Sequence, residues 1–147
     1  RLITEMLADH YINCPTNIFA HKIHDKNAQV FQYHWNYKGN KKTSAFWSTF
    51  SNVWCGEWMG SCHSFEMFAL FGQPFLQPEE FNDEDRIVSK KFINLITYFA
   101  HKNKLFWSEF GQNSKLYHVI DSSIHENKFG ENLKSNECSN LWYDLIV

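Results

Sequence analysis

Helix-like and strand-like patterns of hydrophobic residues alternate along the chain. An apolar lead-in covers residues 2–12. Apolar residues at helical spacing then predict a helix over residues 16–26, with Thr16 as its N-cap. Residues 29–37 are rich in aromatic and β-branched side chains and predict a strand. A segment rich in Ser, Thr, Trp and Gly predicts a loop over residues 41–63.

The rest of the chain carries the same alternation. A short apolar helix is predicted over residues 65–71, and Gly72 is predicted to end it. The longest helix is predicted over residues 83–101, with acidic residues in its first turn. A strand over residues 116–120 and a final helix over residues 138–147 complete the pattern. Alternating helices and strands favour an α/β fold, but two or three strands do not complete its sheet, so a piece of a larger domain is expected.

Composition favours a folded chain with a large aromatic core or an aromatic-lined pocket. Of the 147 residues, 44% are hydrophobic and 18% are aromatic, which excludes disorder. The net charge is only −2 and charges of both signs are interspersed, so no nucleic-acid partner is expected. No apolar run approaches the ~20 residues of a membrane-spanning helix. The sequence starts at Arg1 without an initiator Met or a signal peptide, which favours a piece of a longer protein.

Four cysteines bear on metal binding and on the compartment: Cys14, Cys55, Cys62 and Cys138. None forms a C-x-x-C pair and their spacing matches no zinc module, so neither a metal site nor a cofactor is expected. An even count suits an oxidising compartment and allows three disulfide connectivities. The alternative is a set of buried free thiols in a cytosolic protein.

The stretch that carries candidate chemistry lies where the predicted loop meets the short helix. His63 stands at this junction, where a histidine alone is a weak indication of a site. The surrounding residues read GEWMGSCHSFEMFALFGQPF. This segment resembles a block of cholinesterases and related type-B carboxylesterases that reads E-W-M-G-x-x-H-G-x-E, then a short helix, then F-G-x-P. The matching residues are dense and correctly spaced, so the resemblance is specific.

Further blocks resemble the same family in order and separation. They read DHYINCP with NIFAHKI, VFQYHWNY, EDRIVSKKFINLITYFAHKN, FWSEF and ECSNLW. The resemblance therefore covers nearly the whole chain. It implies that residues 1–147 are the C-terminal segment of a cholinesterase-like carboxylesterase whose upstream part is missing.

The implied fold is the C-terminal part of an α/β-hydrolase, a mostly parallel sheet with flanking helices. The resemblance places the nucleophilic serine, the oxyanion-hole glycines and the acidic triad member upstream, in the order serine, acid, histidine. His63 is then the triad histidine, which accepts the serine proton during attack and returns it to the leaving alcohol. The implied full-length protein is a serine esterase for carboxylic esters, choline esters among them. This chain alone is expected to be inactive.

Two alternatives stay open. A non-catalytic relative on the same fold would serve adhesion or ligand binding, as the neuroligins do. The presence of His63 favours the enzyme, because nothing structural requires an imidazole there. An upstream G-x-S-x-G motif would decide between the two. An autonomous small α/β protein is the second alternative.

Residues around His63 take roles from the same resemblance. Trp58, Met59 and Phe65 fall where cholinesterases line or back the acyl–choline pocket, and an aromatic wall suits a quaternary ammonium group. Ordinary core packing is the alternative for these side chains. Glu66 is expected to be a buried residue that supports the site beside the histidine.

Three features near His63 depart from the family pattern. Ser64 stands where the family usually has Gly, which bears on the local backbone and on full activity. Gly56 replaces a common proline. Cys62 directly precedes the histidine, but adjacent side chains rarely point at one another, so a thiol nucleophile is not expected.

The resemblance also bears on disulfides, location and partners. Cys14 and Cys138 stand where the family has a disulfide, which favours a secreted protein or one on the extracellular face of a membrane. Cys55 and Cys62 have no counterpart in the family and are close enough in sequence to pair with each other. The expected partners are a small-molecule ester and, in the full-length protein, a second copy bound through the C-terminal helices. Asp9 is expected to be a buried hydrogen-bonding anchor.

Overall fold

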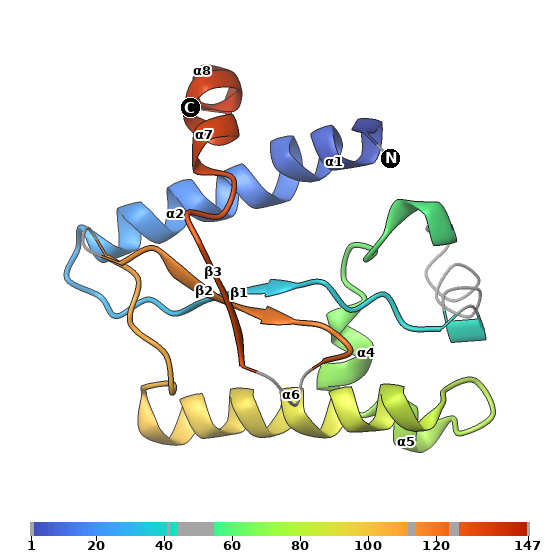
Figure 1. The fold of residues 1–147 in the computed structure, drawn as a ribbon. Helices are drawn as coiled ribbons and strands as arrows, with labels where there is room; N and C mark the ends of the chain where they lie inside the picture. Colours follow the sequence, from blue (N-terminus) through green and yellow to red (C-terminus); the bar gives the residue numbers. More distant parts are fainter. Residues whose placement is uncertain (1, 41, 44–54, 112–113, 124–126, 147) are drawn as a thin grey trace. The chain divides into compact units, whose positions relative to one another are not determined.

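A computed structural model describes residues 2–40, 42–43, 55–111, 114–123 and 127–146. Three strands in these residues form one mixed sheet in the order β1–β2–β3 (Figure 1). They are β1 (Gln32–Trp35), β2 (Leu116–Ile120) and β3 (Lys128–Glu131). Helices make up most of the remaining regular structure. The predicted mixture of helices and strands is therefore confirmed.

The chain divides into two compact units, each made of separate stretches of sequence. The first unit contains residues 1–34, 106–118 and 129–147. The second unit contains residues 35–105 and 119–128. The stretch around His63 lies wholly in the second unit, so the elements that hold it can be described within that unit.

The first unit begins with one continuous helical stretch. Its parts are α1 (Leu2–Ala8), the π-helical turn η1 (Asp9–Asn13) and α2 (Cys14–His24). The predicted helix start with Thr16 as N-cap is therefore wrong. Pro15 has no N–H to donate, but it falls in the first turn of α2, directly after the wider turn in which the Cys14 N–H donates to the Asp9 carbonyl oxygen. That turn carries the helix across the proline.

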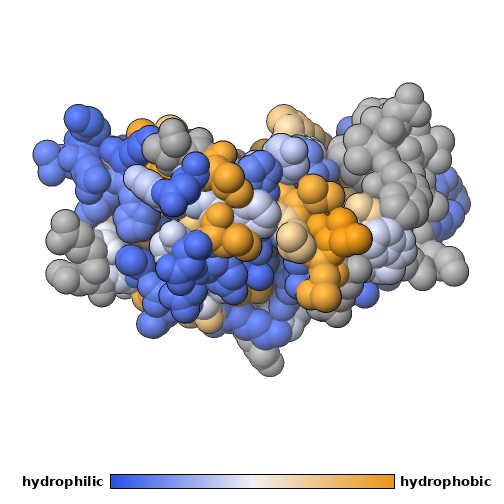
Figure 2. Space-filling model, turned by 90° about the horizontal axis from the view of Figure 1, so that it is seen from above, coloured by the Kyte–Doolittle hydropathy of each residue, from blue (hydrophilic) through white to orange (hydrophobic). Residues whose placement is uncertain are grey.

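Apolar side chains of the first unit remain exposed along this helical stretch. Figure 2 shows apolar patches between hydrophilic regions on one face of the molecule. The exposed large apolar residues of α1 and η1 are Leu2, Ile3, Met6, Leu7, Tyr11 and Ile12. Their spacing places several of them on one side of α1, and that side is free to pack against further protein.

The C-terminal elements of the first unit follow a residue in the left-handed conformation, Lys134 (φ 52°). They are α7 (Ser135–Glu137), the π-helical turn η3 (Cys138–Trp142) and α8 (Tyr143–Ile146). The predicted final helix therefore begins three residues too late. Asp9 is buried as expected; it accepts a hydrogen bond from Asn13 (2.8 Å) and lies 3.5 Å from the Lys134 ammonium group.

Two strands of the sheet differ from the sequence prediction. β1 is shorter than the predicted strand, because the Val30 carbonyl oxygen accepts a hydrogen bond from the Phe110 N–H (2.8 Å) outside the sheet ladder. β3 was missed, since its residues include few of the β-branched side chains that mark a strand. Gly130 in β3 faces the Tyr117 ring so closely that a Cβ atom would lie 2.2 Å from it. A side chain at this position would have to displace the far end of the Tyr117 ring.

Three successive helices lie in the described residues 66–102 of the second unit. They are α4 (Glu66–Leu70), α5 (Gln73–Leu76) and α6 (Asp83–Lys102). Asn82 caps α6: its side chain accepts a hydrogen bond from the Asp85 N–H (2.9 Å), while its own N–H donates to the Asp85 carboxylate (2.8 Å). This reciprocal cap explains why the start of α6 could be read from the sequence. Asn103, left-handed at φ 52°, ends the helix.

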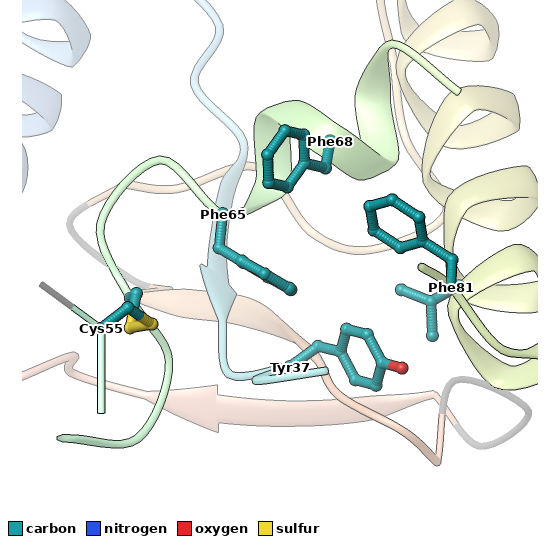
Figure 3. Packing of buried hydrophobic residues seen from close by; sticks show 7 residues of the cluster. Tyr37, Cys55, Phe65, Phe68 and Phe81 are labelled. Carbon is teal, nitrogen blue, oxygen red and sulfur yellow. A yellow bond between two sulfur atoms is a disulfide. The ribbon is translucent and has the colours of Figure 1, made fainter. Parts of the chain in front are cut away.

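The core of the second unit is aromatic. Its largest cluster consists of Tyr37, Cys55, Cys62, Phe65, Phe68, Phe81 and Val88. Figure 3 shows the rings of the labelled residues gathered together, with Cys55 at one end. The rings of Phe65, Phe68 and Phe81 contact one another edge to face, with centroids 5.9 and 5.8 Å apart. The high aromatic content of the sequence is thus partly explained by this core.

None of the helices in the described part of the chain has the length and apolar character of a segment that spans a bilayer.

Candidate active site

His63 begins a tight turn over residues 63–65 that leads into α4. Its side chain is exposed, whereas the neighbouring Cys62 and Phe65 are buried. The imidazole is therefore presented outward from a segment whose neighbours are fixed in the core. Because the imidazole of His63 is exposed, it is not needed for core packing. The chemistry of the ring is therefore its distinguishing property.

A disulfide fixes the residue directly before His63. Cys55 and Cys62 are bonded to each other, with Cα atoms 6.0 Å apart, and both belong to the aromatic core cluster. The bond closes a short loop that contains the 3₁₀ turn η2 (Glu57–Met59). The backbone on this side of His63 is therefore held covalently.

Further contacts join both flanks of His63 to the segment that follows β1. The Ser61 hydroxyl donates a hydrogen bond to the Tyr37 carbonyl oxygen (3.0 Å). On the other flank the Phe65 ring lies against Gly39, so close that a Cβ atom at that glycine would be 2.8 Å from the ring. Gly39 also has a φ of +68°, which favours glycine.

That segment is itself held by a buried carboxylate on α6. Asp85 is 3% exposed and accepts a 2.7 Å hydrogen bond from the Tyr37 hydroxyl. Burial, together with the hydrogen bond to Asp85 and its negative charge, raises the pKa of Tyr37 far above the usual value of 10. The phenol therefore stays protonated and remains a hydrogen-bond donor.

Ser64 adopts a left-handed backbone conformation directly after His63, with φ at 62°. Side chains other than glycine pay a steric cost there, which explains why the family's glycine at this position matters for the backbone. The serine in this chain keeps the conformation that glycine would adopt without strain.

The other residues assigned from the resemblance lie in the same stretch but in different environments. Phe65 is 3% exposed and belongs to the core, so core packing describes it. Trp58 is 49% exposed, so it is not a core residue. Met59 is partly buried, and its sulfur accepts a hydrogen bond from the Gly56 N–H (3.3 Å). Glu66 is partly buried at the first position of α4. The pocket roles of these residues stay predictions.

Sequence reasoning missed Ser61, Tyr37 and Asp85 as parts of this site. The pattern Asn82-x-x-Asp85 at the start of α6 was a usable signal, because it marks a reciprocal cap. The second use of Asp85, on residues more than 40 positions away, had no sequence signal.

Other histidines and cysteines lie elsewhere. His118 in the first unit is buried and stacked on Trp107, with ring centroids 4.9 Å apart, so packing describes it. Cys14 and Cys138, also in the first unit, form the disulfide that the resemblance implies, across a separation of 124 positions. The bond joins the start of α2 to the start of η3.

The sequence matches the model of the carboxylesterase family over residues 1–141. The chain therefore belongs to the carboxylesterase family, whose members have the α/β-hydrolase fold.

Individual relatives come from more than one functional class. The chain is 26% identical to an acetylcholinesterase of Leptinotarsa decemlineata, over 99% of this chain and 22% of the relative. It is 26% identical to acetylcholinesterase-1 of Trittame loki, over 90% of this chain and 23% of the relative. It is 29% identical to the neuroligin-like protein glit-1 of Caenorhabditis elegans, over 69% of this chain and 14% of the relative. The chain thus spans less than a quarter of the length of these relatives.

Proposed function

We propose that this chain is the C-terminal segment of a serine esterase for carboxylic esters, and that His63 is the histidine of its catalytic triad. The observation that carries the proposal is the exposed imidazole of His63, presented from a turn with anchored flanks within the motif E-W-M-G-x-x-H. Family membership and the acetylcholinesterase relatives support the reaction class.

The proposed role follows from the chemistry of a neutral imidazole. His63 accepts the proton of a serine hydroxyl as that oxygen attacks the ester carbonyl carbon, and it then returns the proton to the leaving alcohol. The serine and the acid that orients the ring belong to the upstream part of the proposed full-length protein. No G-x-S-x-G motif occurs within these 147 residues. Choline esters are the first substrates that we propose, because the half-exposed ring of Trp58 suits contact with a quaternary ammonium group.

Location and assembly follow from the same proposal. Two disulfides in the described residues support an extracellular protein, secreted or on the outer face of a membrane. The C-terminal helices expose Leu141, Tyr143 and Leu145, which supports a homodimer formed through these helices in the full-length protein. Light scattering on the full-length protein, with and without residues 139–147, tests the dimer and keeps the Cys14–Cys138 disulfide.

The decisive experiment replaces His63 in the full-length protein. His63→Ala is expected to lower turnover of p-nitrophenyl acetate and acetylthiocholine by about 10⁴-fold, because a triad base is lost. Added imidazole should restore part of that rate, which a structural loss would not allow. His101→Ala is the matched control, since His101 is exposed on α6, and it should stay within about threefold of wild type. A His63→Ala variant that keeps more than about a tenth of wild-type turnover contradicts the proposal.

A second candidate function is adhesion without catalysis. The 29% identity to a neuroligin-like protein favours it. The same experiment separates the two, because an adhesion protein shows no turnover even in its wild-type form.

A further inference from the structure

We propose that Asp85 is a positioning residue for His63, acting through the turn that contains residues 37–40, 42 and 43. The proposal rests on the assignment of His63 as the triad base. Asp85 lies on α6, and its carboxylate is directed to residues that precede the His63 segment by some twenty positions in the sequence. The role is therefore indirect and comes from the way three segments of the second unit are joined.

The Asp85 carboxylate makes more contacts than the helix cap requires. One hydrogen bond, from the Asn82 N–H (2.8 Å), belongs to the cap. The others come from the Tyr37 hydroxyl (2.7 Å), the Asn40 amide (2.9 Å) and the Thr43 hydroxyl (3.0 Å). A buried carboxylate with four donors is satisfied, and charge-assisted hydrogen bonds of this kind are about twice as strong as neutral ones. Asp85 therefore fixes both ends of the turn.

The turn contacts the side chains of two residues that flank His63, one on each side of it. The Tyr37 carbonyl oxygen accepts the hydrogen bond from Ser61, two residues before the histidine. Gly39 packs against the ring of Phe65, two residues after it. A displacement of the turn therefore moves both flanks of His63, whereas the Cys55–Cys62 disulfide fixes only the preceding flank.

This arrangement predicts a loss of catalytic geometry when the carboxylate or its phenol partner is changed. A catalytic group misplaced by about 1 Å can lose about 10²-fold in rate. Binding of the ester is not affected directly, because Asp85 and Tyr37 are buried in the core. The expected signature is a lower kcat with an unchanged KM.

The test uses the full-length protein with Tyr37→Phe and Asp85→Asn. Tyr37→Phe keeps the ring in the core and removes only the hydroxyl. Asp85→Asn replaces the carboxylate by an amide, so that an NH₂ group faces donors that now bond to a carboxylate oxygen. Turnover of p-nitrophenyl acetate is expressed per active site, counted by stoichiometric phosphonylation, so that unfolded molecules do not contribute. We expect kcat to fall about 10- to 100-fold with KM within about twofold, and backbone hydrogen exchange over residues 60–66 to become faster.

Asp9→Asn is the matched control. Asp9 is also a buried aspartate with side-chain partners, but it lies in the first unit. It should change neither kcat per active site nor exchange over residues 60–66. Wild-type kcat per site in Tyr37→Phe, or unchanged exchange in both variants, overturns the positioning role and leaves the proposed function intact if His63→Ala is inactive. An active His63→Ala variant overturns the proposed function itself, and with it the positioning role.

Discussion

Ser89 and Ala69 are joined by a hydrogen bond from the serine hydroxyl to the main-chain oxygen of Ala69, with a length of 2.6 Å. Ser89 lies on α6 and Ala69 on α4, and both residues are buried. The bond therefore joins the long helix to the short helix that follows His63. The Ala69 carbonyl oxygen, near the end of α4, also accepts a hydrogen bond from the Gly72 N–H (3.3 Å).

Ser89→Ala is expected to destabilise the protein by about 0.5–1.5 kcal/mol, because one buried hydrogen bond to the Ala69 carbonyl oxygen is lost while the one from the Gly72 N–H remains. Ser139→Ala is the matched control: its hydroxyl donates to the Ser135 carbonyl oxygen (2.7 Å) in an exposed part of the chain. That change should cost less than about 0.5 kcal/mol. Thermal unfolding of both variants compares the two costs, and equal losses would contradict the assignment.

Ser64→Gly should keep or raise turnover in the full-length protein, because glycine adopts a φ of 62° without steric cost. Ser64→Val introduces a β-branched side chain at the same φ and should be about 1–2 kcal/mol less stable than Ser64→Gly. The thermal midpoints and ester turnover of the pair test the strain. A valine variant as stable as the glycine variant would show that the left-handed conformation is absent in solution.

The two disulfides should contribute unequally to stability. The chain-entropy model gives about 5 kcal/mol for a loop of 124 positions and about 2.5 kcal/mol for one of 7. Cys14→Ala/Cys138→Ala should therefore lower stability about twice as much as Cys55→Ala/Cys62→Ala. Peptide mapping without reductant should first recover both linked pairs. If the two double variants unfold at the same midpoint, loop length does not determine the contribution.

Stability should fall as the pH drops through the range of histidine titration, partly because of His34. Burial, followed by the positive charge of Lys134, lowers the pKa of His34 below its ordinary value of 6.5, while Asp9 opposes the shift. The unfolded chain then binds a proton that the folded chain binds only at lower pH, so stability present above about pH 6.5 is lost as the pH falls.

His34→Gln should flatten that pH dependence, measured as the unfolding midpoint between pH 7.5 and pH 5. The pKa of His21 is also lowered, so this residue should still contribute part of the pH dependence of stability in the His34→Gln variant. A slope equal to wild type in His34→Gln would show that the ring is not held in its desolvated place.

The 147-residue chain by itself should not hydrolyse esters. The proposed nucleophile and oxyanion donors, which supply most of the barrier reduction, lie outside this sequence. The purified chain and its His63→Ala variant should therefore give the same background rate with p-nitrophenyl acetate. A faster rate for the unsubstituted chain would mean that it contains a complete site.

Local signals explain which elements could be predicted from the sequence. The helix over residues 83–101 was right to within one residue, because its cap and its apolar side are both encoded locally. The strand over residues 116–120 matches β2. By contrast, the helix start at Thr16 was wrong, because a π-helical turn carries the chain past Pro15.

The contacts around His63 show what a sequence pattern leaves out. The resemblance assigned a role to His63, which stays a prediction, and the pairing of Cys55 with Cys62, left open from the sequence, is found in the structure. The hydrogen bonds of Asp85 join residues 42 to 48 positions apart, and no periodicity connects such residues.

The Cys14–Cys138 bond also makes the chain between these residues a covalent ring. A protease that cuts the ring once between residues 14 and 138 opens it without releasing a fragment. On a gel without reductant the nicked molecule keeps its full mass, and only reduction separates the two pieces. Integrity of this segment should therefore be judged on reduced samples, since an intact band under oxidising conditions does not exclude a single cut.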